Sequence, residues 1–439
     1  MATIAAPAML GWSAVIGLYG STAAHWSVLA RPLLTVIAIA VLIGVVARLS
    51  VRGTGATAVA TASIALLVGG LPTVMTVIAL GGWGALAYWR RIKHRPQPRL
   101  PYRHLVRLTA ILLVVVVSGT VAGGAVVDGD LSAQPSETPA DTDENRPSIY
   151  VLLLDGYPRI DTLARDFSFD NGAWIAQLEG LGFEHHPEAV SPATRTEQSL
   201  LAMFAPASDR DGDRRTIRAR LAKSSGLKML ALAGYQRVHI ASPVVHVNFG
   251  GWDRVIDTGQ LNEFETTLIQ RARLVSWVAA DWVVSQYRER FEASLAALVT
   301  EARRPGQKAV LAHVMAPHVP FLYDEGGRPA PALPCWVGGC GMFDSDRKDV
   351  SLSRNEYRER FTANLEAVNQ RVLSAIRAVV DADPEAIVII ASDHGVRHEP
   401  PSEEWNRSLL LGRGAHVTTI EALFERLLRT LEESVLDGH

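Results

Sequence analysis

The hydrophobic and polar residues of this chain divide it near Val127 into two parts with different patterns. Before that point, long apolar runs cover residues 5–24, 32–49, 54–70, 71–89 and 107–127. Each run is close to the ~20 residues with which a helix crosses the ~30 Å hydrocarbon core of a bilayer. We therefore predict an α-helical transmembrane domain over residues 1–127 with about five spans. Four spans are the alternative, because threonine and serine dilute the run at 54–70.

A second pattern begins after an acidic stretch at 128–147, which is rich in Pro, Ser and Thr and has no apolar periodicity. The later chain predicts alternating strands and helices. One helix starts at the capping box Ser353-x-x-Glu356 and ends at Asp383-Pro384. Near-continuous apolar runs, typical of strands buried on both faces, lie at 148–155, 237–242, 309–315 and 386–392. We predict a flexible linker over 128–147 and an α/β domain over 148–439, with a mostly parallel sheet flanked by helices.

Charge separates the same two parts and predicts their orientation. Residues 1–127 contain no Asp or Glu, whereas all 45 acidic residues and 33 of the 43 basic residues follow, which gives the second part a net charge of −12. Seven basic residues lie between Arg90 and Arg107, and Arg48 and Arg52 separate the second and third runs. The positive-inside rule places both segments in the cytoplasm. We predict a multi-pass protein of the cell membrane, with a cytoplasmic N-terminus and an extracytoplasmic second domain.

This composition excludes a wholly soluble enzyme, a disordered chain and a nucleic-acid binder with a basic face. The two cysteines, Cys335 and Cys340, lie in the sequence PCWVGGC. An oxidising compartment and a Gly-Gly turn favour a local disulfide between them. A metal site is the alternative, although the local sequence offers no further Cys or His ligand.

Polar side chains follow the predicted strands at their carboxyl ends, where sites form in parallel sheets. Asp155 follows the first strand, and Asp393 and His394 follow the last one in the sequence SDHG. Carboxylate oxygens and imidazole nitrogens are ligands for divalent metals. Each residue taken alone also fits an ordinary turn or a cap at the end of a strand.

The segment SPATRTEQSLLAMF, residues 191–204, predicts the start of a helix. Thr194-x-x-Glu197 fits a capping box, which needs no catalytic role. The alternative places Thr196 in the first helical turn, where N–H groups and the helix dipole favour an oxyanion. A hydroxyl there, in contact with a divalent cation, could attack phosphorus.

Other side chains could assist at the same edge of the sheet. His313 and His318, in HVMAPHVPF, follow another strand and could bind a second metal or give a proton to a leaving group. His398, in DHGVRH, is a further candidate. Arg159 and Arg195 could clamp phosphate oxygens, with salt bridges as the alternative use. Histidines without such a context are expected to be structural or exposed: His185, His186, His239 and His246.

In combination, four patches resemble the alkaline phosphatase/sulfatase superfamily. They are an Asp after a first strand, a Thr-x-x-Ser helix start, His-x4-His-x-Pro, and Ser-Asp-His-Gly. The membrane anchor followed by an outer domain is similar to lipoteichoic acid synthases and lipid A phosphoethanolamine transferases. Residues 196–204 resemble the nucleophile helix of the latter, and residues 313–320 resemble their histidine loop.

This resemblance implies an enzyme with one divalent metal. Zinc suits the nitrogen and oxygen ligands best, and manganese is the second choice. Thr196 would be the nucleophile, and His318, with His313 and His398, would contact the transferred group or a second metal. The implied metal ligands are Asp155, Thr196, Asp393 and His394.

Two departures from the family pattern bear on the function. The membrane transferases usually have Glu at the position of Asp155. Val190 stands where formylglycine sulfatases have a Cys or Ser in their Cys/Ser-x-Pro-x-Arg motif, which disfavours a sulfatase of that kind.

Three functions fit the sequence. The first is a membrane-bound transferase that moves a phosphoglycerol- or phosphoethanolamine-like headgroup from a phospholipid through Thr196 to an envelope glycolipid or cell-wall glycan. The second is a phosphatase or phosphodiesterase with the same residues and water as the acceptor. The third is a non-catalytic envelope protein that uses the outer domain for binding; the presence of Asp155, Thr196, Asp393 and His394 argues against it.

Overall fold

The computed structural model describes residues 15, 16, 19, 26–50, 146–206, 212–271, 273–333, 352–396, 403–414, 419–421 and 423–436. By their internal contacts, residues 1–127 and 264–279 form one unit, and residues 128–263 and 280–439 form a second. The predicted disulfide between Cys335 and Cys340, His398, and the apolar runs from residue 54 to residue 127 lie outside the described residues.

In the first unit, a short 3-10 helix η1 (Trp26–Leu29) leads into α2 (Ala30–Ser50), which covers the apolar run at 32–49. The Arg31 guanidinium pairs with the Glu265 carboxylate at 2.9 Å, and the Tyr19 ring lies edge-on to Phe264. By a hydropathy criterion, none of the helices among the described residues is both long and apolar enough to span a membrane. The number of spans stays a prediction.

The second unit contains a seven-stranded sheet with the order β2-β7-β6-β1-β5-β3-β4. The central pairs β6–β1, β1–β5, β5–β3 and β3–β4 are parallel, and the edge pairs β6–β7 and β7–β2 are antiparallel. The strands are β1 (Ile149–Leu154), β2 (Glu184–His185), β3 (Gln236–Ile240), β4 (Arg254–Ile256), β5 (Lys308–Val314), β6 (Ile387–Ser392) and β7 (Leu410–Arg413). The mostly parallel sheet confirms the predicted α/β class, and the four predicted strands match β1, β3, β5 and β6 within two residues. The short strands β2, β4 and β7 were not predicted.

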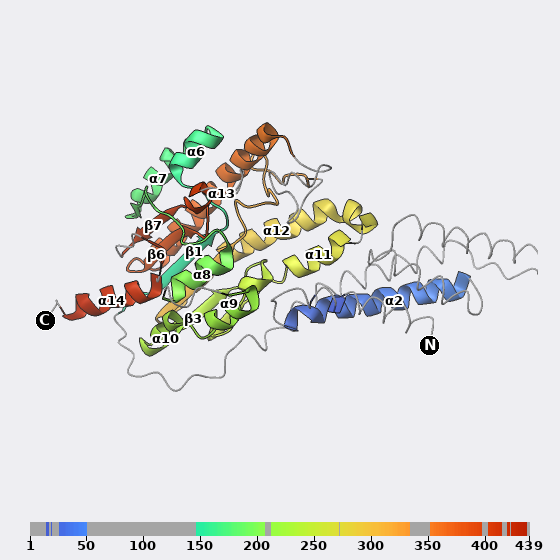
Figure 1. Ribbon diagram of the computed structural model, residues 1–439, viewed down its shortest axis with the longest axis horizontal. Helices are drawn as coiled ribbons and strands as arrows, with labels where there is room; N and C mark the ends of the chain where they lie inside the picture. The colour runs from blue at the N-terminus through green and yellow to red at the C-terminus, as the bar shows by residue number, and fades with distance from the viewer. Residues whose placement is uncertain are drawn as a thin grey trace, which may run out of the picture. The chain divides into compact units, whose positions relative to one another are not determined.

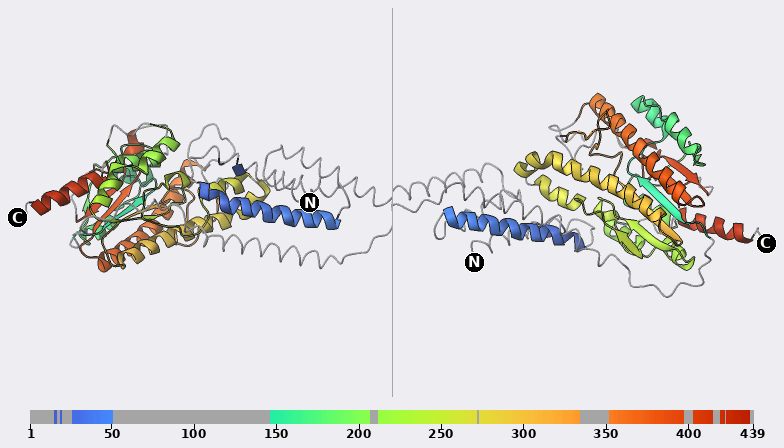
Figure 2. Two further views of the ribbon diagram at one scale, coloured as in Figure 1. Left: turned by 90° about the horizontal axis from the view of Figure 1, so that it is seen from below. Right: turned by 180° about the vertical axis from the view of Figure 1, so that it is seen from behind.

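Helices cover both faces of this sheet (Figures 1 and 2). Ile149, Val151 and Leu153 of β1 share a hydrophobic core with α8, α9, α10 and α14. On the other face, the Tyr150 hydroxyl donates to the carboxylate of Asp383 at the end of α13, and α12 and α13 lie on that side. The helices of this unit are α6 (Ile160–Phe167), α7 (Gly172–Glu179), α8 (Thr196–Phe204), α9 (Arg214–Leu221), α10 (Ser225–Leu232), η4 (Val245–Val247), the later part of α12 (Arg273–Ala302), α13 (Arg354–Ala382), η5 (Glu403–Asn406) and α14 (Leu423–Leu436). Residues 264–279, which include most of α11 (Glu263–Arg271) and the start of α12, belong to the first unit.

The start and end of α13 confirm what its sequence predicts. The Ser353 hydroxyl accepts from the Glu356 N–H, and the Glu356 carboxylate accepts from the Ser353 N–H, so the capping box is complete. The helix ends at Asp383, directly before Pro384. Phe361, on its buried side, packs against Phe167 of α6 with ring centroids 4.6 Å apart.

Candidate active site

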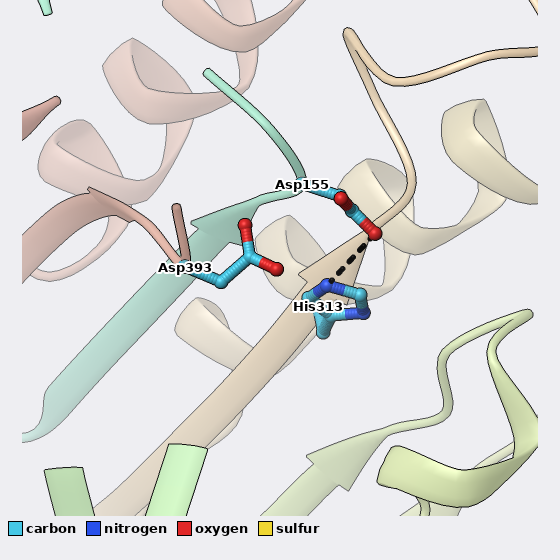
Figure 3. A group of neighbouring side chains, drawn as sticks. All are labelled: Asp155, His313 and Asp393. Atoms are coloured by element: carbon cyan, nitrogen blue, oxygen red, sulfur yellow. Dashed lines mark ion pairs between the residues drawn. The ribbon is translucent and has the colours of Figure 1, made fainter. Parts of the chain in front are cut away.

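The strand register brings three polar side chains to the carboxyl edge of the sheet. Leu153 of β1 pairs with His313 of β5 on one side and with Ala391 of β6 on the other. Because side chains alternate between the two faces of a strand, Asp155 and Asp393 continue on the same face as His313. This is the face covered by α8, since Leu153 and Ala391 belong to its core. Figure 3 shows Asp155, His313 and Asp393 pointing toward one another.

These three residues form a buried group whose geometry could hold a metal ion. Each offers one ligand atom, and these atoms all lie within 4.8 Å of one another. The exposed fractions are 4% for Asp155, 1% for His313 and 0% for Asp393. His394 Nε2 faces the same group, 3.3 Å from Asp393 Oδ2 and 3.6 Å from Asp155 Oδ1.

The hydrogen bonding of the group fits a metal better than a purely structural role. Asp393 Oδ1 accepts from the N–H groups of Gly156 and His394, both at 2.9 Å. Asp393 Oδ2 and His313 Nε2 are buried and have no hydrogen-bond partner among the described residues. Buried polar atoms are nearly always paired, so these two atoms point to a missing partner between them. Two carboxylates with imidazole nitrogens form a ligand set that zinc accepts.

The protonation states also suit a cation. Burial lowers the pKa of His313 to about 4, so its ring is neutral at neutral pH and retains a lone pair. The 3.7 Å contact between His313 Nε2 and Asp155 Oδ2 is therefore not an ion pair at that pH. Burial raises the pKa of Asp393, but the nearby His394 and His313 and hydrogen bonds from Thr196 and Gly156 outweigh it. Its net pKa is lowered, so the carboxylate is ionised.

Each histidine of the group is oriented through its other ring nitrogen. His394 Nδ1 lies 2.7 Å from the carbonyl oxygen of Gly395, to which it donates, so that Nε2 carries the lone pair. His313 Nδ1 lies 2.6 Å from the Ser242 hydroxyl. If Nδ1–H donates to that hydroxyl, the lone pair of Nε2 points to the carboxylates. Sequence reasoning did not select Ser242, although it stands at the end of a predicted strand, as the other site residues do.

A turn after β1 brings His318 beside the same group. Gly156 has a positive φ of +69°, which an L side chain rarely adopts. A Cβ at this position would lie 3.6 Å from both His318 Cδ2 and His394 Cε1. The His318 N–H donates to the carbonyl of Asp155, and its Nδ1 lies 2.8 Å from the carbonyl oxygen of Val319.

Thr196 is the first residue of α8 and is 7% exposed. It lies close enough to Asp393 to contribute to the lowered pKa of that carboxylate. The loop before α8 is hydrogen-bonded to the segment that contains Asp393, because the Ser191 hydroxyl donates to the Asp393 carbonyl. The same hydroxyl also contacts the Ser199 hydroxyl at 2.9 Å. The structure therefore brings Thr196 together with Asp155, His313, Asp393 and His394.

The expected capping box at Thr194 does not form. The N-cap of α8 is Arg195, and no side chain caps the helix. Glu197, which would have completed the box, instead accepts from Arg214 at 3.0 Å and faces His246 Nε2 at 3.3 Å. A local sequence pattern was thus overridden by two partners distant in sequence.

The buried His246 is the centre of an ionic cluster beside the first turn of α8. Its Nδ1 lies 3.5 Å from Glu263 Oε2, on the side opposite Glu197. Burial lowers its pKa, but hydrogen bonds to Glu197 and Glu263 outweigh that effect and raise the pKa above its usual value. This agrees with the expectation of a structural residue, but the sequence around His246 gives no signal for its two carboxylate partners.

The two arginine candidates lie differently. Arg159 is buried and holds both carboxylate oxygens of Asp161, at 2.8 and 2.7 Å, so the salt-bridge alternative applies to it. Arg195 is exposed at the start of α8, directly before Thr196.

No protein-family model and no curated protein sequence matches the chain. Solved structures are similar to it at low identity. The soluble domain of lipooligosaccharide phosphoethanolamine transferase A from Neisseria meningitidis is 15% identical, with 63% of this chain and 79% of that chain covered and a TM-score of 0.40. The integral membrane form of that transferase is 13% identical, with 93% and 88% covered and a TM-score of 0.37.

A sulfatase structure is among the similar ones as well. A putative sulfatase from Bacteroides thetaiotaomicron is 13% identical, with 63% of this chain and 68% of that chain covered and a TM-score of 0.39. Phosphoethanolamine transferases are one of the two kinds of membrane enzyme that the motifs resemble, whereas the position of Val190 disfavours a formylglycine sulfatase. Phosphoethanolamine transferases and sulfatases both belong to the alkaline phosphatase/sulfatase superfamily. Because these TM-scores lie below 0.5, the functional proposal rests on the residues of the site.

Proposed function

We propose that this chain is a membrane-bound, metal-dependent transferase that moves a phospho-headgroup from a phospholipid, through Thr196, to an envelope glycolipid or cell-wall glycan. One observation carries the proposal. Thr196, in the first turn of α8, lies beside Asp393 and contributes to its lowered pKa, and this buried carboxylate belongs to a group that could hold a metal. A nucleophile, a cation site and a helix N-terminus for an oxyanion thus meet at one point.

The proposed metal ligands are Asp155, Asp393, His394 and the Thr196 hydroxyl, and the geometry adds His313. Zinc is the first choice and manganese the second. A bound divalent ion would lower the pKa of the Thr196 hydroxyl and offset the charge on the phosphoryl oxygens.

The reaction consists of two displacements at phosphorus. In the first, a bond forms from Thr196 Oγ1 to phosphorus while the bond to the lipid glycerol oxygen breaks, and diacylglycerol leaves with the threonine proton. In the second, an acceptor hydroxyl takes the phospho-group and Thr196 regains a proton. His318 is the proposed proton carrier, because Nδ1–H donation to the Val319 carbonyl makes Nε2 the basic nitrogen.

The predicted membrane domain gives this chemistry access to its donor. A transmembrane domain over 1–127 and a linker over 128–147 would hold the site near the outer headgroups, which raises the effective concentration of phospholipid. The cytoplasmic N-terminus and extracytoplasmic catalytic domain follow from the basic loops at 48–52 and 90–107.

The nucleophile is tested by incubating the full-length protein in detergent with mixed phospholipids and zinc or manganese. Mass spectrometry of the peptide that contains Thr196 then measures any adduct. We expect an adduct on Thr196 whose mass identifies the headgroup. Thr196→Ala should abolish it, and the neighbouring Thr194→Ala should retain it. Release of headgroup into water without an adduct would indicate a hydrolase. With no adduct, no release and no bound metal, both enzymatic functions would be wrong.

The metal site is tested by Asp393→Asn. We expect bound zinc or manganese, measured by elemental analysis, to be lost, and headgroup release to fall by at least about 100-fold. Asp381→Asn removes an exposed carboxylate on α13 and should leave both values unchanged. Full metal content in the Asp393→Asn protein would contradict the proposed ligand set.

A further inference from the structure

A pocket lies at the opposite end of α8 from Thr196. It has a volume of about 710 Å³ and is lined by the end of α8, by α9, by the start of α10 and by Glu425 of α14. The nine residues of α8 place the two ends about 12 Å apart, at 1.5 Å per residue. Ala205 and Pro206 line the pocket, and none of the residues of the candidate active site does.

The pocket is basic within an acidic domain. Four of its lining residues are cationic: Arg215, Arg220, Lys223 and Lys228. Among the described residues, Lys223 and Lys228 pair with no carboxylate, and both are exposed. The chain after Val127 has a net charge of −12, so a cluster of four cations differs in sign from the domain as a whole.

The two carboxylates in the pocket wall accept hydrogen bonds from other residues of the wall. Asp213 caps α9 by accepting from the Thr216 N–H at 2.8 Å. Glu425 accepts from the Ser225 hydroxyl at 2.5 Å and faces Arg429 at 3.5 Å. Their hydrogen bonds hold the wall together and leave a net positive lining.

The start of α10 adds donors to this lining. Ser224 is the N-cap residue of the helix, yet its side chain makes no capping hydrogen bond. It is 4% exposed, lines the pocket, and its Oγ has no hydrogen-bond partner among the described residues. The first-turn N–H groups and the positive end of the helix dipole lie at the same place, which is where helices bind phosphate.

We propose that this pocket is a second anion site, which binds a phosphate group carried by a lipid headgroup or by a small soluble phosphate ester. A basic surface that is only solvated does not explain why the Ser224 hydroxyl is buried without a partner. A phosphate oxygen would supply that partner after a rotation of the Ser224 side chain. The lysines and arginines neutralise the phosphate charge from the rim. This site is independent of the reaction proposed at Thr196.

The test uses full-length protein in detergent, with EDTA present so that no metal at Asp393 binds phosphate. Inorganic phosphate, glycerol phosphate and phosphatidylglycerol in the micelles are titrated separately by calorimetry. We expect Lys223→Gln/Lys228→Gln to weaken binding by about tenfold or more, because charge-assisted hydrogen bonds are lost. Arg303→Gln/Arg354→Gln makes the same change of charge at two exposed positions, directly after α12 and at the start of α13, and should bind as the wild type does.

Ser224→Ala keeps every charge and should weaken binding by about threefold or more, since one hydrogen bond is removed. It also serves if the double lysine variant does not fold. Binding of the soluble probes would identify a small phosphate ester, and binding of phosphatidylglycerol alone would identify a lipid headgroup. Wild-type protein that binds none of the probes, or pocket variants that bind as the wild type does, would overturn the proposal.

Discussion

Ser242 decides which nitrogen of His313 faces the candidate metal site. Its hydroxyl lies 2.6 Å from His313 Nδ1 and also accepts from the Val244 N–H at 3.0 Å. With that second donor in place, the hydroxyl is suited to accept from Nδ1–H, which leaves Nε2 as the ligand atom. A partner of this kind fixes both the tautomer and the orientation of a metal-binding ring.

Ser242→Ala should therefore weaken metal affinity by about 10- to 100-fold. The measurement is competition for zinc with a chelator of known affinity, on full-length protein in detergent. Ser285→Ala removes an exposed hydroxyl that donates to the carbonyl of Trp282 on α12, and it should have no effect. Equal affinities in the two variants would show that His313 is not a ligand.

At the same scale, the sequence identified three residues of the candidate metal site but gave the fourth, His313, a different role. Asp155, Asp393 and His394 were selected because each follows a strand that is recognisable from its apolar run. His313 was assigned to a substrate or a second metal, whereas the register of β5 against β1 places it with Asp155 and Asp393. Strand register depends on pairing between distant segments, which one sequence does not contain.

At the scale of elements, a buried histidine joins the start of α8 to the start of α11. His246, in η4, lies between Glu197 of α8 and Glu263 of α11, and Arg214 and the more distant His318 are the other charges that face these carboxylates. The raised pKa of His246 means that its proton stabilises the fold. That stabilisation is complete below the ordinary histidine pKa of about 6.5 and is lost as pH rises through the raised value.

His246→Gln should remove this pH dependence. We expect the wild-type protein in detergent to unfold at a higher temperature than the His246→Gln protein. This difference should be largest at about pH 6 and smaller at about pH 9. Differential scanning fluorimetry across that range measures both proteins. Parallel profiles would show that His246 carries no proton in the folded state.

The capping box of α13 gives a second prediction for an element. Ser353→Ala should lower the free energy of unfolding by about 0.5–2 kcal/mol, because the first turn loses the acceptor for the Glu356 N–H. Ser353→Asp retains an acceptor and should remain close to the wild type. Denaturant titration compares the three proteins, and an equal loss in both variants would mean that the hydroxyl stabilises something other than the cap.

At the scale of the whole molecule, the separation of charge predicts on which side of the membrane the second domain lies. The segment at 128–147 is acidic, lacks apolar residues in a periodic pattern, and follows the last predicted span. A protease added to sealed right-side-out vesicles should cut there and release a soluble fragment that begins near residue 148. Inside-out vesicles should protect the segment. Cleavage only in inside-out vesicles would contradict the proposed topology and place the segment on the cytoplasmic side.

The sequence by itself determined the features that depend on short stretches of chain. Apolar runs of six to eight residues gave the central strands, because a strand of a parallel sheet is buried on both faces. The capping box gave the start of α13, since its two hydrogen bonds join residues three apart. Asp155, Asp393 and His394 could be selected because sites in such sheets form where strands end.

Only the tertiary structure decided the features that join distant segments. It placed His313 with the two aspartates, turned Glu197 from a helix cap to an ionic partner of His246, and grouped residues 264–279 with the first unit. It also gathered the lysines and arginines of α9, of α10 and of the turn between them around Ser224. The physical reason is the same in each case: pairing between strands and burial of charge depend on neighbours in space, whose identity the local sequence does not specify.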